Sequence, residues 1–108
     1  MIEVRLFKTK AGALYGFTAN SHGSDLVCAA VSILVQNAVN SIERFTEDGF
    51  KCEYDEAGGY LRFTHEAIRS GKAVNDASLL LNSLELGLNG IRDEYENEIK
   101  IYTEVDHD

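Results

Sequence analysis

Residues 25–45 have the sequence DLVCAAVSILVQNAVNSIERF, in which apolar side chains recur every three or four positions. This period and length are typical of an amphipathic helix, and the segment is too long for a strand. Ser24 precedes it as a predicted N-cap, and Asp25 places an acidic side chain in its first turn. The first half is apolar around much of its circumference, so we expect the start of this helix to be buried or covered by a partner.

Alternating apolar and polar side chains predict strands on both sides of this helix. Two strands precede it as a hairpin, two follow it as a second hairpin, and one closes the sequence. Their expected ranges are 2–8, 14–19, 50–54, 60–63 and 98–105, with turns at 10–12 and 56–59.

A second, leucine-rich helix is predicted from about Ala73 to Glu96. One stripe of it carries Leu80, Leu84, Leu88, Ile91 and Tyr95. Glycine weakens a helix, so we expect Gly87 and Gly90 to be there because this helix packs closely against another element. The order of elements predicts a two-layer α+β fold, with a mixed, mostly antiparallel sheet and both helices on one face.

Length and charge limit the classes of function. With 108 residues and a mass of 12.0 kDa, residues 1–108 are expected to form a single domain. The net charge is -8, which disfavours direct binding to nucleic acid and favours a basic protein partner. The apolar stretch 26–35 is too short to span a membrane, and residues 1–7 do not resemble a secretory signal. We therefore expect a cytoplasmic protein with two reduced cysteines and no membrane contact.

Cys28 and His22 are the candidates for nucleophilic chemistry. Cys28 falls in the first turn of the first helix, where unpaired N–H groups and the helix dipole stabilise a thiolate. His22 lies on the polar segment just before the helix and could act as the base. The alternatives are that Cys28 is a small core side chain and that His22 is only solvated.

Two further residues accompany this pair. Asp25 could orient the ring of His22 or only stabilise the helix start, and Ser32 lies one turn beyond Cys28 on the same face. His22, Asp25 and Cys28 are spaced three residues apart, so a three-ligand zinc site is a weaker alternative that lacks a fourth ligand.

The remaining cysteine and histidines are expected to play no part in this chemistry. Cys52 alternates in phase with Phe50 and Tyr54, which predicts a buried strand face and a structural role. His65 and His107 have no plausible partners in the sequence.

The stretch GFTANSHGSDLVCAAVS, residues 16–32, resembles the ribosomal-processing cysteine proteases called Prp. Members of that family have a strand that ends in a Gly-His pair, a variable loop and a helix that begins Asp-x-Val-Cys-Ala-x-x-Ser. A hairpin with a Gly-Gly turn and a leucine-rich helix follow, as they do here. Ser21 stands where the family usually has glycine, and the five residues between His22 and Cys28 are fewer than in many members.

The resemblance implies that His22 is the catalytic base and Cys28 the nucleophile, with Asp25 and Ser32 at accompanying motif positions. It implies a homodimeric endopeptidase, without metal or cofactor, that removes the N-terminal extension of large-subunit ribosomal protein number twenty-seven. A basic ribosomal protein would suit the acidic composition. The alternative is a catalytically idle protein that binds a ribosomal protein or the ribosome through the same groove.

Overall fold

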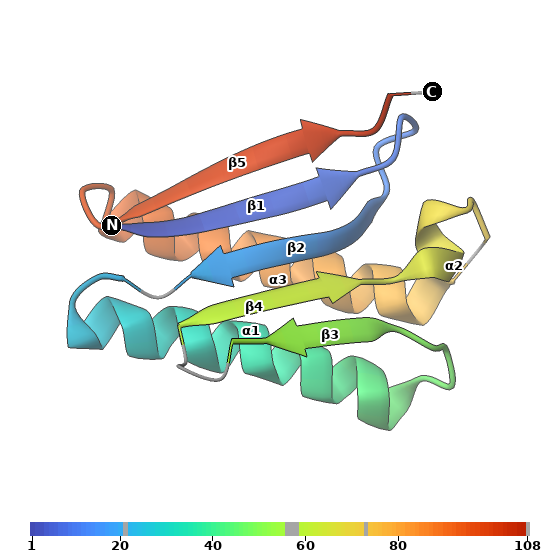
Figure 1. Cartoon of the computed structure of the whole chain (residues 1–108), viewed down its shortest axis with the longest axis horizontal. Coiled ribbons are helices and arrows are strands. Elements are labelled where there is room, and N and C mark those ends of the chain that lie inside the picture. The colour runs from blue at the N-terminus through green and yellow to red at the C-terminus, as the bar shows by residue number, and fades with distance from the viewer. Residues whose placement is uncertain (21, 56–58, 73, 108) are drawn as a thin grey trace.

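The computed structural model describes residues 1–20, 22–55, 59–72 and 74–107, which form two layers (Figure 1). Within these residues, five strands form one sheet, and the two long helices lie side by side across one of its faces. The strands are β1 (Ile2–Lys8), β2 (Leu14–Asn20), β3 (Lys51–Tyr54), β4 (Tyr60–Thr64) and β5 (Ile99–Val105), and the helices are α1 (Asp25–Phe45), α2 (Glu66–Arg69) and α3 (Asn75–Glu94). The predicted α+β architecture is confirmed.

The strand order is β3-β4-β2-β1-β5. The β1–β2, β2–β4 and β3–β4 pairs are antiparallel, and β1–β5 is parallel. The sheet is therefore mixed and mostly antiparallel, as predicted. This order places the C-terminal end of β2 beside the N-terminal ends of β1 and β5, where the chain turns into α1 (Figure 1).

The core lies between the sheet and the two long helices. Every second side chain of β1 is buried against α1 and α3, and in α1 the buried stripe is the predicted one. In α3 the stripe differs from the prediction, because Ala77 and Leu81 are buried with Leu84 and Leu88 while Leu80 is only half-buried. Side chains of α3 pack against the sheet as well as against α1. The centre of the buried stripe is therefore rotated about the helix axis relative to the predicted stripe.

The two helix glycines differ in their surroundings. A Cβ on Gly87 would lie 2.9 Å from Cδ1 of Leu34, so this glycine lets α3 pack closely on α1, as predicted. A Cβ on Gly90 would meet nothing within 4 Å, so the prediction is wrong at that position.

Three details of the sequence prediction need correction. The short helix α2 was not predicted, and its N-cap is His65, whose Nδ1 accepts a hydrogen bond from the Ile68 N–H at 3.3 Å. His65 is fully buried, and its Nε2 lies 3.9 Å from a carboxylate oxygen of Asp48, so it does have partners. The strand face of Phe50 and Cys52 is half-buried, but Tyr54 at its end is exposed. Ser21, the turn at 56–58 and Ala73 lie outside the described residues.

Helix α1 also departs from the expectation that no segment could cross a membrane. It has 21 residues, and an 18-residue stretch within it has a mean hydropathy of 1.4, which meets the length and composition of a membrane span. Six of its residues form one stripe packed into the core, and the core helix of a globular domain meets the same criteria.

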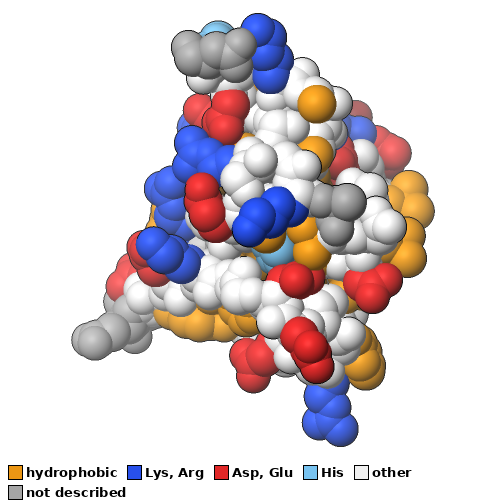
Figure 2. Space-filling model, turned by 90° about the vertical axis from the view of Figure 1, so that its right-hand side faces the viewer, with side chains coloured by type: hydrophobic (Ala, Val, Ile, Leu, Met, Phe, Trp, Pro, Cys, Tyr) orange, Lys and Arg blue, Asp and Glu red, His pale blue; other side chains and the backbone are white. Residues whose placement is uncertain are grey.

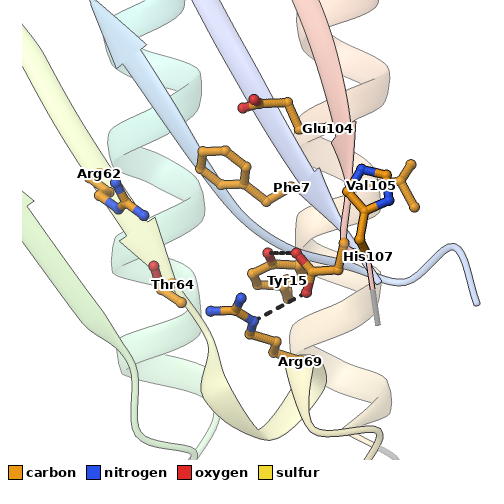
Figure 3. A pocket seen from close by; sticks show the side chains of 9 residues that line it. Phe7, Tyr15, Arg62, Thr64, Arg69, Glu104, Val105 and His107 are labelled. Carbon is orange, nitrogen blue, oxygen red and sulfur yellow. Dashed lines mark hydrogen bonds and ion pairs between the residues drawn. The ribbon is translucent and has the colours of Figure 1, made fainter. Parts of the chain in front are cut away.

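The far end of β2 carries a polar network that ties the C-terminal segment to the sheet. The Tyr15 hydroxyl donates a hydrogen bond to Oδ1 of Asp106 at 2.6 Å, and Nε of Arg69 donates to Oδ2 of Asp106 at 3.2 Å. Figure 3 shows Tyr15 and Arg69 close together in the pocket at this end of the sheet. Burial and the hydrogen bond to Asp106 raise the pKa of the Tyr15 hydroxyl. His107 lines the same pocket. The pocket lies at the Leu14 end of β2, so the length of that strand separates it from the segment around His22.

Candidate active site

The segment between β2 and α1 forms a capped helix start. The Ser24 side chain accepts a hydrogen bond from the Val27 N–H at 3.4 Å, and the Ser24 carbonyl accepts from the Cys28 N–H at 2.9 Å. The predicted N-cap is therefore confirmed. Among the described residues, the N–H groups of Asp25 and Leu26 find no acceptor, as is usual in a first helical turn. These two groups can bind an anionic oxygen.

Cys28 lies in this first turn, half-buried against the core. Its Sγ accepts a hydrogen bond from the backbone N–H of Gly23 at 3.3 Å. A backbone donor therefore points at the sulfur, at the end of α1 where unpaired N–H groups gather. Cys28 thus has the surroundings of a nucleophile, and its contact with the core does not remove it from solvent.

His22 is adjacent in sequence to Gly23, so its backbone lies one residue from the group that donates to Cys28. Its carbonyl accepts a hydrogen bond from the Met1 ammonium at 2.6 Å, and its side chain is exposed. Within the described residues, no hydrogen bond joins the imidazole to Cys28 or to Asp25. The structure therefore brings the two segments together but does not form the imidazole–thiol contact.

The other predicted residues are more peripheral. Asp25 is exposed in the first turn of α1, which is the helix-start position considered from sequence. Ser32 is exposed one turn beyond Cys28 and lines a cavity under the β3–β4 hairpin. The described residues contain no group of three His, Cys, Asp or Glu side chains arranged to hold a metal, so the alternative zinc site at His22, Asp25 and Cys28 is not assembled.

Glu98 is a residue of this site that sequence reasoning missed. Its Oε1 accepts a hydrogen bond from the Ser24 N–H at 3.3 Å, and its carbonyl accepts from the Ile2 N–H at 2.8 Å. A Cβ on Gly23 would lie 3.0 Å from the Ile2 side chain, so the loop also rests closely on β1. Glu98 is 74 residues from Ser24, and no local pattern could have shown that β5 returns beside β1.

Cys52 differs from Cys28 in its surroundings. It is half-buried on the helix side of β3 and packs against the core, in keeping with a structural role. Burial raises the pKa of the Cys52 thiol, which makes it a poorer nucleophile at neutral pH.

Known proteins resemble this chain over nearly its whole length. The family model described as cysteine protease Prp matches residues 1–100. The ribosomal processing cysteine protease Prp of Staphylococcus aureus (strain Mu50 / ATCC 700699) is 35% identical over 81 residues, which are 74% of this chain and 72% of that protein. The protein of the same name from Bacillus subtilis (strain 168) is 33% identical over 86 residues, 78% of this chain and 75% of that protein.

Solved structures agree with these matches. The essential ribosomal processing protease Prp from S. aureus, in complex with a covalently linked product peptide, has a TM-score of 0.86 at 25% identity, covering 96% of this chain and 100% of that chain. SMU.848 from Streptococcus mutans has a TM-score of 0.85 at 27% identity, covering 98% of this chain and 96% of that chain.

Proposed function

The chain belongs to the Prp family of cysteine proteases, and on this premise we propose that it removes the N-terminal extension of large-subunit ribosomal protein number twenty-seven, using Cys28 and His22. The observation that carries the proposal is the sulfur of Cys28, held in the first turn of α1 with the Gly23 N–H directed at it. The family supplies the reaction class, and this geometry supports the choice of nucleophile.

The reaction proceeds in two steps. His22 takes the thiol proton, the Cys28 thiolate attacks the scissile carbonyl, and the proton passes to the leaving amine as the C–N bond breaks. The resulting thioester is hydrolysed by a water from which His22 removes a proton, which it returns to sulfur. The free N–H groups of Asp25 and Leu26 stabilise the oxyanion in both steps. For this, the exposed imidazole of His22 must turn toward the thiol when substrate binds.

The distribution of charge supports a basic substrate. Beside the Ser24 loop, the last turn of α3 carries Asp93 and Glu94, and the turn from α3 into β5 carries Glu96 and Glu98. Only Asp93 of these four has a basic side chain close by, Arg92 at 3.3 Å, within the described residues. At the end of the molecule that carries α2, acidic and basic side chains are intermixed (Figure 2). A lysine- and arginine-rich protein is therefore attracted toward the edge of the site.

The same proposal includes a homodimer that acts in the cytoplasm, where ribosomal proteins are synthesised. Large apolar side chains are exposed on the outer face of the helix layer: Leu26, Ile33, Leu79 and Leu86. Residues 26–42 contain no charged side chain although the chain carries a net charge of -8, so two copies can meet on this face without repulsion. A partner on this face accounts for the first half of α1 being apolar around much of its circumference.

Light scattering after gel filtration tests the dimer. The double variant Ile33→Asp, Leu86→Asp should elute as a monomer, because it places two pairs of charges in the contact. The variant Val105→Asp, at an exposed apolar residue on β5, serves as the control and should remain dimeric. A monomeric wild-type protein would exclude this part of the proposal.

The alternative function, a catalytically idle binding protein that uses the same groove, is favoured by the absence of an imidazole–thiol hydrogen bond. Incubation of the purified chain with the extended ribosomal protein separates the two functions. Mass spectrometry should show a shortened product with wild type and none with Cys28→Ala. Binding without any cleavage by wild type would support the idle protein instead.

A further inference from the structure

A cavity of about 210 Å³ lies between α1 and the underside of the β3–β4 hairpin. Its floor is apolar and consists of four buried side chains, Ala19, Val31, Val35 and Leu61. These residues come from β2, α1 and β4, the elements that also carry the core, so the floor is rigid. None of them takes part in the reaction described above.

The cavity begins next to the proposed nucleophile. Ser32 lines it and lies one helical turn beyond Cys28, about 6 Å along the axis of α1 at 1.5 Å per residue. Ala19 lines it from the end of β2, shortly before the chain reaches His22. An extended peptide advances about 3.3 Å per residue. A side chain one or two residues from the scissile bond can therefore reach this cavity.

The far end of the cavity is closed by two side chains. Tyr54 pairs across the sheet with Leu61, which places its ring on the same side as the floor. Its hydroxyl lies 3.4 Å from Nε2 of Gln36, and the same Nε2 donates to Oδ1 of Asn40 at 3.0 Å. The hydrogen bond to Asn40 fixes the side chain of Gln36, and the hydrogen bond from Gln36 fixes the ring of Tyr54. These side chains form a wall, so the cavity ends here and does not continue as a groove.

We propose that this cavity is a specificity pocket that holds one large apolar side chain of the peptide substrate, and that Gln36 and Tyr54 set its size. The inference rests on the proposed protease function and adds the residues that select the cleavage segment. A cavity of about 150 Å³ lined by apolar side chains accommodates benzene, so the present volume is sufficient for one ring or one branched chain. The exposed ring of Tyr54 would lose contact with water when the pocket fills, which favours an apolar occupant.

Cleavage of a peptide series tests the pocket. The series places alanine, leucine or phenylalanine at each of the two positions on either side of the scissile bond. One position should show a preference of about tenfold or more in kcat/KM for leucine or phenylalanine over alanine, a size typical of an apolar pocket. Equal rates for all side chains at every position would overturn the proposal.

Variants of the wall then link this preference to the pocket. Tyr54→Ala and Gln36→Ala should reduce the preference to about threefold or less by raising KM for the large side chains, with the alanine peptide little affected. Both side chains are exposed, so the fold should survive. Asn37→Ala and Phe45→Ala, exposed residues of α1 outside the cavity, are the matched controls. Equal effects from wall and control variants would exclude a role for Gln36 and Tyr54.

Binding measurements separate this inference from the protease function. Cys28→Ala cannot cleave but keeps the cavity, so calorimetry with the same peptides should show the same side-chain preference in Kd. If wild type cleaves nothing while binding by Cys28→Ala still discriminates, the protease proposal fails and the pocket stands. If wild type cleaves without discrimination in rate or in binding, the protease proposal stands and the pocket fails.

Discussion

The carboxylate of Glu98 accepts a hydrogen bond from the backbone N–H of Ser24, with Oε1 and N 3.3 Å apart. Ser24 in turn caps α1, and its neighbour Gly23 donates to the sulfur of Cys28. Glu98 is therefore linked to Cys28, the proposed nucleophile, through two backbone groups without touching it. We regard it as a positioning residue, because its backbone is fixed between the end of α3 and β1.

Replacing Glu98 tests this role. Glu98→Ala should lower kcat about fivefold with little change in KM, since loss of a single hydrogen bond corresponds to about 1 kcal/mol. Glu98→Gln keeps the accepting oxygen and should retain activity within about twofold. The alkylation rate of Cys28 should follow the same order. Equal losses in both variants would indicate that the charge of Glu98, and not its hydrogen bond, matters.

The proposed dyad predicts opposite consequences for the two cysteines. Cys28→Ala should abolish cleavage and His22→Ala should remove most of it, because they take away the nucleophile and the base. His22 is exposed, so its loss should leave the thermal unfolding midpoint unchanged. Cys52→Ala should keep activity and lose about 1 kcal/mol of unfolding free energy, because it leaves a small gap beside the core. Full cleavage by Cys28→Ala would rule out the mechanism.

The two thiols should also differ in reactivity. Below pH 8, iodoacetamide should modify Cys28 faster than Cys52, because the thiolate reacts and burial raises the pKa of Cys52. Peptide mapping by mass spectrometry after short exposures gives the two rates. Labelling under denaturing conditions is the control, since unfolding should make them equal. Comparable rates in the folded protein would count against an activated Cys28.

Salt should act on capture of the substrate more than on the reaction. Raising ionic strength should raise KM for the intact ribosomal protein and change kcat little, because screening weakens the attraction to the acidic turn beside the site. A short peptide with only the cleavage segment should respond less. The double variant Glu94→Gln, Glu96→Gln should raise KM for the intact ribosomal protein at low ionic strength, and so reproduce part of the effect of salt. Identical salt responses of peptide and protein would assign recognition to the site alone.

His65 makes stability depend on pH. Burial lowers the pKa of His65 below its ordinary 6.5, and the nearby Asp48 carboxylate opposes this only in part. The unfolded chain therefore binds the proton more readily, so stability is complete above about pH 6.5 and falls as pH decreases toward the lower folded pKa.

Urea unfolding at pH 7.5 and 5.5 measures this loss. Asp48→Asn should enlarge the loss of stability between the two pH values, because it removes the carboxylate that opposes the lowering of the His65 pKa. His65→Asn keeps an oxygen that can cap α2 and should reduce the pH dependence. An unchanged pH dependence in His65→Asn would assign it to other groups.

The sequence by itself determined the long helix, the two hairpins and the pairing of Cys28 with a helix start. Residues 25–45 were predicted as a helix with the bounds observed, because their apolar period and the Ser24 cap are local features that act within a few residues. The family motif covers the same segment. For this reason the candidate nucleophile and base could be named before the fold was known.

Only the tertiary structure decided what surrounds them. The contact of Glu98 with Ser24 depends on the parallel pairing of β5 with β1, and the pocket wall depends on how the β3–β4 hairpin lies over α1. The burial of His65 and the choice of which α3 side chains are buried likewise depend on packing between distant segments. Periodicity reports which face of one element is apolar, but which elements meet is set by sheet order and by the close fit of side chains across the core.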